Sequence, residues 1–299
     1  MATMTTMIIE PLDACFGAAV TGIELATMSD DHFDELYAKW LEYGLLVFPG
    51  QDLTREHQVA VAARFGDIEI EMAELSNVKA DGSLRQDDGT DDMMKVHRGN
   101  MGWHHDSTYM PVQAKGAIFC AEVVPDEGGA TGFADMRAAY DALDDAIRQR
   151  IEGLRAHHSL YHSQAKVGHQ GTAVDDGQVN AGAKDDYGGY GFHDGPVSVR
   201  PLVKEHPETG RKNLNIGRHA YDVVGMEPGE SEALLAELNA FAVSEPARIY
   251  HHDWEPGDAV LWDNRRLMHQ ATPWPFDQVR IMWHTRIAGS PETEAALTE

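Results

Sequence analysis

Apolar residues recur at helical spacing in four separate segments of the chain. In each of them, hydrophobic side chains fall at i, i+3 and i+4, so that one face of the segment is apolar. Such a face predicts an amphipathic helix packed against a core. The four segments run from Ser29-Asp30 to Gly44, from Thr54 to Phe65, from Asp135 to about Leu154, and from Glu230 to Phe241.

Short apolar or alternating runs fill much of the remaining chain and predict β-strands. These runs are residues 45–48, 117–124, 197–203, 214–216, 247–252, 259–267 and 280–287. Strands therefore follow strands, and the helices do not alternate with them as regular βαβ units. This order favours a mainly antiparallel sandwich or barrel with added helices.

Two stretches lack either pattern. Residues 80–94 are polar and acidic, and residues 163–196 contain eight glycines. A segment of this length without regular structure inside a compact domain is usually a lid, a binding loop or a disordered region. We therefore expect one domain over residues 1–299, with a glycine-rich lid or insert near 163–196.

Composition narrows the possible functions. The 299 residues include 24 Lys+Arg and 49 Asp+Glu, which gives a net charge of −25. This charge would repel nucleic acids and anionic membranes, so neither is an expected partner. The two cysteines, Cys15 and Cys120, fit a reducing compartment. The start of the sequence has no secretory pattern, and no apolar run approaches about 20 residues, so a cytoplasmic protein is expected.

The first candidate for chemistry is the triplet His104-His105-Asp106. In a strand, His104 and Asp106 would project from the same face and could ligate one metal ion. Two histidines and one carboxylate on one face of an octahedron leave three positions open, as in non-haem Fe(II) oxygenases. By itself, the triplet could equally be two polar residues on a solvent-exposed strand. A metal site therefore needs a third ligand from a distant part of the chain.

A second triplet of the same form, His251-His252-Asp253, tests this interpretation. Both triplets precede His269, but the second one is too close to it for a barrel to fold between them. Asp106 and His269 are 163 residues apart, which leaves ample chain for that fold. We therefore favour His104, Asp106 and His269 as the metal ligands.

Positive charge is concentrated in the strand-like run 280–287. Alternation would place Arg280, His284 and Arg286 on one face of that strand, together with Met282. Because guanidinium groups bind carboxylates through two hydrogen bonds, this face is suited to binding anions. In a chain of such negative net charge, this local concentration favours a functional role.

In combination, these residues resemble the Fe(II)/2-oxoglutarate-dependent dioxygenases of the taurine and dichlorophenoxyacetate group. The resemblance rests on the His-x-Asp triplet, the distal histidine and an arginine eleven residues after it, and it extends over nearly the whole chain. Further matches are residues 65–67, 128–131 and 262–265, while residues 102–111 and 200–204 look most like the (S)-selective phenoxypropionate (dichlorprop) dioxygenases.

The resemblance implies a double-stranded β-helix (jelly roll) with helices packed around it. It also implies that His104, Asp106 and His269 hold Fe(II), to which 2-oxoglutarate and O2 are added as cosubstrates. In the family, the far carboxylate of 2-oxoglutarate pairs with an arginine and a threonine, and a tryptophan contacts the same cosubstrate. The positions in this sequence that match these three residues are Arg280, Thr131 and Trp262.

The substrate side of the family pattern matches less completely. A second arginine commonly follows the first by four residues, but here that position is His284, and Arg286 lies two residues further on. Either side chain could meet the substrate carboxylate. Asn100 and His219 also match substrate-contacting positions. For each of these residues, a purely structural role on a loop remains the alternative.

The resemblance implies oxidative cleavage of an aryloxyalkanoate, a phenoxypropionate-type herbicide, to a phenol and a 2-oxo acid with release of succinate and carbon dioxide. The substrate is thus a small anionic aromatic molecule, and enzymes of this family are often homo-oligomers. One alternative is a hydroxylase of the same family acting on an alkylsulfonate or alkylsulfate, which His284 mildly disfavours. Another is a non-catalytic jelly roll that senses a small acid or a metal.

Overall fold

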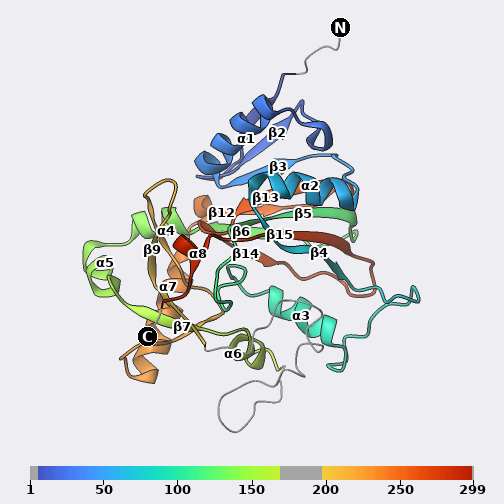
Figure 1. Ribbon diagram of the computed structural model, residues 1–299. Coiled ribbons are helices and arrows are strands. Elements are labelled where there is room, and N and C mark those ends of the chain that lie inside the picture. The colour runs from blue at the N-terminus through green and yellow to red at the C-terminus, as the bar shows by residue number, and fades with distance from the viewer. Residues whose placement is uncertain (1–5, 169–196, 298–299) are drawn as a thin grey trace.

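Two β-sheets form the centre of the computed structural model, which describes residues 6–168 and 197–297 (Figure 1). Apart from the parallel pair β2–β3, the paired strands of both sheets are antiparallel. The large sheet has the order β1 (Ile8–Pro11), β2 (Ala18–Thr21), β3 (Leu45–Phe48), β13 (Ala259–Asp263), β5 (Gly116–Val123), β15 (Ile281–Ile287) and β4 (Ile68–Ser76). The small sheet has the order β12 (Ile249–His252), β6 (Thr131–Asp135) and β14 (Leu267–Ala271).

A buried apolar cluster joins the inner faces of the two sheets. Val47, Phe119 and Trp262 come from the large sheet, and Phe133 and Leu267 from the small one. Because inward-facing residues alternate with outward-facing ones along each strand, the two faces can share one core. This arrangement of two facing sheets with helices outside them confirms the expected mainly β, double-stranded β-helix fold.

Two helices cover the outer face of the large sheet, as the apolar spacing predicts. They are α1 (Asp30–Tyr43) and α2 (Arg55–Phe65), which begin after the capping residues Ser29 and Thr54 (Figure 1). Trp40 of α1 and Phe65 of α2 belong to a second buried cluster, which also contains Ile118 of β5. The large sheet is therefore held between this layer and the central core.

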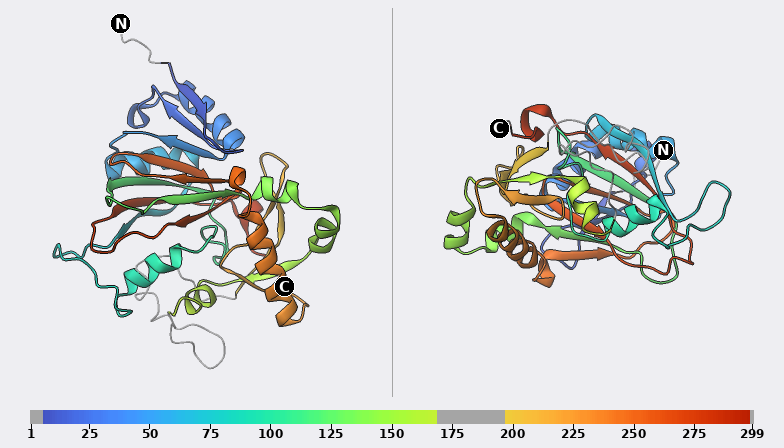
Figure 2. Two further views of the ribbon diagram at one scale, coloured as in Figure 1. Left: turned by 180° about the vertical axis from the view of Figure 1, so that it is seen from behind. Right: turned by 90° about the horizontal axis from the view of Figure 1, so that it is seen from below.

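A third buried cluster covers the outer face of the small sheet. It combines Ala134 and Met268 of that sheet with α4 (Met136–Ala142) and α7 (Pro228–Ala242). A further three-stranded sheet of β11 (Ala220–Val223), β7 (Arg155–His158) and β8 (Ser198–Pro201) packs on the same side, and Figure 2 shows it together with α7.

Several predicted elements are divided in the structure. The expected helix over 135–154 is two helices, α4 and α5 (Asp145–Ile151), because the chain turns extended at Leu143 and Asp144 caps the second helix. The expected strand over 259–267 is β13 and β14, which lie in opposite sheets. Likewise, the expected strand over 197–203 is divided into β8 and β9 (Val203–Glu205). The strand expected at 214–216 lies two residues earlier, as β10 (Lys212–Leu214). The expected strand over 247–252 begins only after the 3-10 helix η3 (Pro246–Arg248).

The prediction omits the edge strand β4, although its residues 68–72 alternate between apolar and charged side chains. It also missed four short helical segments. They are η1 (Leu25–Thr27), α3 (Asp92–Asn100), α6 (Leu160–Ala165) and α8 (Pro291–Glu294). The first residues of α3 belong to the polar stretch 80–94, where Asp91 caps the helix.

Of the expected glycine-rich lid or insert near 163–196, residues 169–196 lie outside the described residues. Residues 163–165 end helix α6. The single domain over 1–299 therefore stays a prediction. None of the helices in the described part of the chain has the length and apolar character to cross a bilayer.

The C-terminal segment supports the loop over residues 106–113. Arg200 of β8 donates hydrogen bonds to the carbonyl oxygens of Thr108, Met110 and Glu294, so one buried guanidinium links the loop to α8. The backbone N–H of Gln113 also donates to Glu294 at 3.0 Å. The loop is thus fixed by contacts with both β8 and α8.

Candidate metal centre

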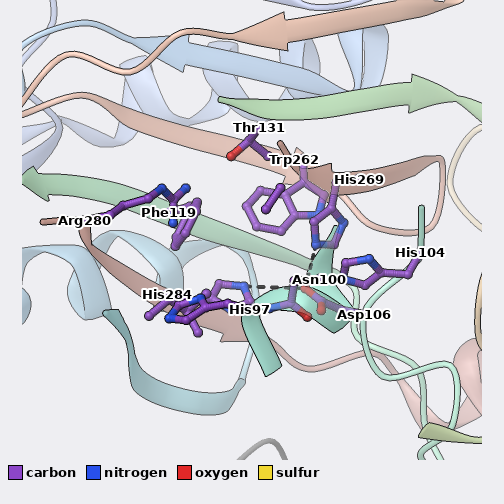
Figure 3. A pocket seen from close by; sticks show the side chains of 12 residues that line it. His97, Asn100, His104, Asp106, Phe119, Thr131, Trp262, His269, Arg280 and His284 are labelled. Atoms are coloured by element: carbon purple, nitrogen blue, oxygen red, sulfur yellow. Dashed lines mark ion pairs between the residues drawn. The ribbon is translucent and has the colours of Figure 1, made fainter. Parts of the chain in front are cut away.

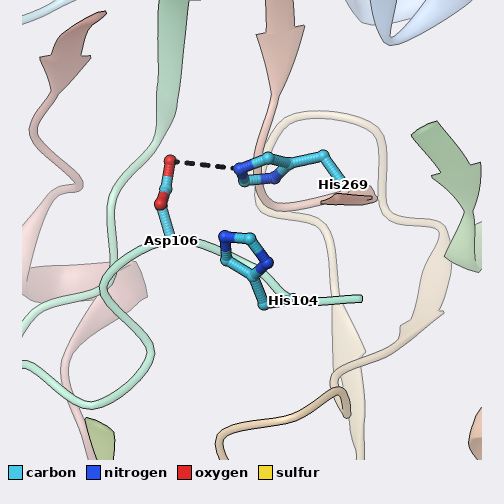
Figure 4. Close-up of side chains that lie close together, drawn as sticks. All are labelled: His104, Asp106 and His269. Carbon is cyan, nitrogen blue, oxygen red and sulfur yellow. Dashed lines mark ion pairs between the residues drawn. The ribbon is translucent and has the colours of Figure 1, made fainter. Parts of the chain in front are cut away.

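Three buried side chains from two distant parts of the chain meet between the sheets. His104 and Asp106 lie on the loop after α3, and His269 lies on β14. One ligand atom from each residue falls within 4.8 Å of the others, as Figure 4 illustrates. Within residues 6–168 and 197–297, this is the one cluster of at least three potential ligands that meets this distance.

The triplet 104–106 does not form the strand that was expected. His104 instead makes an isolated antiparallel bridge with His269, with N–H to carbonyl distances of 3.0 and 2.8 Å. The chain then turns, and Ser107 adopts a left-handed φ of 57°. The bridge therefore fixes the two histidine backbones beside each other, and the turn brings the carboxylate back toward both rings.

Hydrogen bonds orient these groups. His104 Nδ1 lies 2.7 Å from the Gly102 carbonyl oxygen, which can only accept, so Nε2 carries the lone pair. His269 Nε2 lies 3.7 Å from Asp106 Oδ2. The side chain of Asn264 binds the Asp106 backbone on both sides, accepting from its N–H at 2.7 Å and donating to its carbonyl at 2.9 Å.

Arg286 binds Oδ1, the oxygen of the Asp106 carboxylate that faces away from His269. Its Nη2 lies 3.1 Å from Asp106 Oδ1, and its Nη1 donates to Ser107 Oγ at 2.9 Å. Ser107 in turn donates to Glu69. Oδ2 has no hydrogen-bond partner among the described residues and faces His269 and His284. Arg286, which was expected to bind substrate, is therefore placed against Asp106 and is not among the residues that line the adjacent cavity.

The protonation states suit metal binding. Burial by itself would raise the pKa of Asp106, but Arg286, followed by the neighbouring imidazoles, holds it well below its usual range. Burial lowers the pKa of His104, and it lowers that of His269 to about 4. At neutral pH the site thus offers an ionised carboxylate and two neutral imidazoles, which are the forms that ligate metal ions.

A pocket opens beside the three ligands (Figure 3). Apolar and neutral polar side chains make up most of its wall, with Arg280 on the side away from His104. The lining residues are Leu75, His97, Asn100, His104, Asp106, Phe119, Thr131, Trp262, His269, Ala271, Arg280 and His284.

The residues expected to hold 2-oxoglutarate all line this cavity. Arg280 Nε donates to the Gly129 carbonyl at 3.2 Å, and the guanidinium lies over the Trp274 ring at 5.0 Å. Gly129 has a φ of 70°, and a Cβ there would come within 3.2 Å of Arg280 Nε. Thr131 accepts a hydrogen bond at 3.0 Å from a buried indole N–H, and Trp262 stacks on His284 with ring centroids 5.5 Å apart.

Only some of the expected substrate residues line the cavity. Asn100 and His284 line the cavity. His219 does not: its ring packs edge-on against His104 at 5.6 Å, and its Nδ1 lies 2.8 Å from Ser163 Oγ. His219 therefore contacts the ligand residue His104 without lining the cavity.

Sequence reasoning missed His97, which faces the cavity from α3 one turn before Asn100. Burial lowers the pKa of His97 to about 4, and its ring packs edge-on against Trp274 at 5.4 Å. The signal was the i, i+3 spacing of His97 and Asn100, which is informative only if this segment is known to be helical.

The second triplet contributes no ligands to this site. His251 and Asp253 are exposed, and His252 Nε2 lies 3.1 Å from Asp258 Oδ2 in the core. These residues do not join any cluster of three potential ligands in the described part of the chain. The preference for the first triplet therefore agrees with the geometry.

Comparison with known proteins identifies relatives over almost the full length. The family model described as "Taurine catabolism dioxygenase TauD, TfdA family" matches residues 8–286. A protein of Sphingobium herbicidovorans named (S)-phenoxypropionate/alpha-ketoglutarate-dioxygenase is 64% identical over 289 residues, which cover 97% of each chain. A protein of the same name from Delftia acidovorans is 52% identical and covers 98% of each chain.

The fold matches a solved structure as well. The crystal structure of AAD-2 in complex with Mn(II) and N-oxalylglycine superimposes with a TM-score of 0.86 and 34% sequence identity. The match covers 98% of this chain and all of that one.

Proposed function

The chain belongs to the taurine catabolism dioxygenase TauD, TfdA family, and we propose that it cleaves an aryloxyalkanoate oxidatively. The substrate class is a phenoxypropionate-type herbicide, and the products are a phenol and a 2-oxo acid together with succinate and carbon dioxide. Fe(II), 2-oxoglutarate and O2 complete the reaction. The observation that carries this proposal is the cluster of His104, Asp106 and His269 beside a cavity that also contains Arg280.

The donor set supports Fe(II) as the metal. Two neutral imidazoles and one carboxylate leave room for a bidentate cosubstrate and for oxygen on the same ion. The lone pair of His104 Nε2 belongs to this buried cluster, and so does Asp106 Oδ2, which has no hydrogen-bond partner in the described part of the chain. A buried acceptor without a partner is costly, and metal binding would relieve that cost. When bound, the iron supplies the chemistry that couples decarboxylation of 2-oxoglutarate by O2 to oxidation of the substrate.

The protein's contribution is binding and orientation. Arg280 and Thr131 would pair with the far carboxylate of 2-oxoglutarate, and the Trp262 ring would pack against the same cosubstrate. Arg280 is buried and its guanidinium is held over Trp274, so the anion would meet a positioned partner. This arrangement fixes which end of the cosubstrate reaches the metal ligands.

The remaining wall of the cavity would take the aryloxy acid. Leu75, Phe119 and Ala271 offer apolar surface for an aromatic ring. Asn100 and His284 supply hydrogen-bond donors for its polar end. These side chains would orient the carbon next to the ether oxygen so that one of its hydrogens faces the metal. That orientation would select the bond that is cleaved.

The experiment is an aerobic assay of the purified protein with Fe(II), ascorbate, 2-oxoglutarate and a substrate panel. The panel contains both enantiomers of dichlorprop, a phenoxyacetate, an alkylsulfonate and an alkylsulfate. We expect succinate and a phenol in equal amounts from one dichlorprop enantiomer. Succinate formed only with the sulfur compounds would assign the alternative substrate class, and no succinate with any compound would favour a binding protein. Asp106→Ala is the matched inactive control.

Two further expectations belong to this proposal. Both cysteines are free thiols in the structure, which supports a reducing, cytoplasmic location. A homo-oligomer is expected from the family resemblance, and sedimentation of the purified protein measures it directly.

A further inference from the structure

A second tryptophan lies behind the proposed 2-oxoglutarate site. Trp254, just after β12, is 8% exposed and belongs to the core between the sheets. Its Nε1 lies 3.0 Å from Thr131 Oγ on β6. Trp254 does not line the cavity itself, whereas Thr131 does.

The direction of this hydrogen bond is fixed by chemistry. An indole N–H can only donate, so the Thr131 oxygen must accept. The hydroxyl hydrogen must then point elsewhere. No other hydrogen bond of this hydroxyl is formed with the residues that the structure describes. Figure 3 shows the Thr131 oxygen on the side of the cavity where Arg280 lies.

Two neighbouring rings hold the indole in place. The Phe119 ring packs edge-on against Trp254 at 5.4 Å, and the His252 ring does so at 4.4 Å. His252 is itself fixed by Asp258, with 3.1 Å between Nε2 and Oδ2. The N–H therefore cannot turn away from Thr131 without disturbing the core.

We propose that Trp254 is a positioning residue that orients the Thr131 hydroxyl as a hydrogen-bond donor to the far carboxylate of 2-oxoglutarate. This inference rests on the proposed function. With its lone pair engaged by the indole, the hydroxyl presents its hydrogen to the anion beside Arg280. A freely rotating hydroxyl would have to be ordered when the cosubstrate binds, at a cost in affinity.

The test compares two ligands that differ at the far carboxylate. In Trp254→Phe the ring contacts remain and the donor is lost. We expect the KM for 2-oxoglutarate to rise about 3- to 10-fold, the loss typical of one hydrogen bond, with kcat within about twofold. Calorimetry with N-oxalylglycine and the Mn(II)-loaded protein should give the same loss without turnover. Inhibition by 2-oxopentanoate, which lacks the far carboxylate, should not change.

A double-mutant cycle identifies the partner. Trp254→Phe should have its full effect in a Thr131→Ser background, which keeps a hydroxyl, and no effect in Thr131→Val, which has none. Trp40→Phe is the matched control. Trp40 is fully buried, and its Nε1 has no hydrogen-bond partner within the described residues. This change should leave the affinities for both oxo acids as they are.

Three results would overturn the proposal. They are unchanged binding of N-oxalylglycine in Trp254→Phe, equal weakening of 2-oxopentanoate, or an effect that persists in Thr131→Val. Failure of the proposed function is distinct, because the wild-type protein would then show neither 2-oxoglutarate turnover nor N-oxalylglycine binding.

Discussion

Arg286 Nη2 lies 3.1 Å from Asp106 Oδ1 and so leaves Oδ2 of that carboxylate to face the ligand residue His269. Both side chains are buried, and Arg286 is also bonded to Ser107. The contact stabilises the ionised form of Asp106 and restricts its rotation, as partners behind metal ligands commonly do.

We therefore expect Arg286→Met to weaken metal binding about 10- to 100-fold, as is typical when such a partner is lost. Calorimetric titration of the apoprotein with Mn(II) measures this directly. Arg266→Met, which breaks the buried ion pair with Asp135, is the control for general damage. If metal affinity is unchanged while the KM for the aryloxy acid rises, Arg286 acts in substrate recognition, as the strand pattern suggested.

Removal of one ligand should abolish the reaction. In His269→Ala, the metal site keeps one imidazole and one carboxylate, so we expect no detectable succinate and much weaker Mn(II) binding. His251→Ala, which changes an exposed histidine of the other triplet, should keep full activity. The opposite ranking of these two variants would transfer the metal site to the second triplet.

Arg280 should affect the binding of 2-oxoglutarate more than that of the aryloxy acid. Arg280→Gln removes the positive charge but keeps a donor, and we expect the KM for 2-oxoglutarate to rise at least about tenfold, in line with a lost charged hydrogen bond. The KM for the aryloxy acid should change much less. Steady-state kinetics with each substrate varied in turn decides this, and the reverse order would reassign the arginine to the substrate.

The burial of His97 predicts that the free energy of unfolding depends on pH. Its pKa is about 4 in the folded protein because it is buried, against 6.5 when exposed. Between these values the unfolded chain binds one more proton, so the free energy of unfolding falls as the pH drops from 6.5 toward 4, by up to about 1.4 kcal/mol per pH unit.

Urea denaturation of the apoprotein at several pH values measures this slope. His97→Gln should reduce the slope by up to about 1.4 kcal/mol per pH unit and leave the part due to other buried histidines such as His269. His57→Gln, at an exposed histidine on α2, should leave the slope unchanged. An unchanged slope in His97→Gln would mean that His97 does not carry this proton.

The sequence predicts the fold class and the long helices because their signals are local. Two helices begin directly after Ser29 and Thr54, where the apolar pattern starts. Alternation places His284 and Arg286 on the inner side of β15, with Arg280 just before the strand. Local signals fail where two elements meet: the helix over 135–154 breaks because Asp144 caps a new helix within it.

The site residues were selected by type and spacing, but their partners depend on tertiary packing. Arg286 faces Glu69 and Ser107, which are 217 and 179 residues away along the chain. Trp254 carries no motif that separates it from other core aromatics, and only its distance to Thr131 distinguishes it. The local path of residues 104–106 likewise depends on His269.

The link from Arg200 to both the 106–113 loop and α8 determines when the metal site can be completed during synthesis. On the ribosome, His104 and Asp106 emerge long before His269, and the loop that carries Asp106 lacks its outer support until Glu294 has left the exit tunnel. The loop that carries Asp106 therefore gains its full support only after Glu294 has emerged. Removal of residues 290–299 should therefore weaken metal binding more than it alters the sheets.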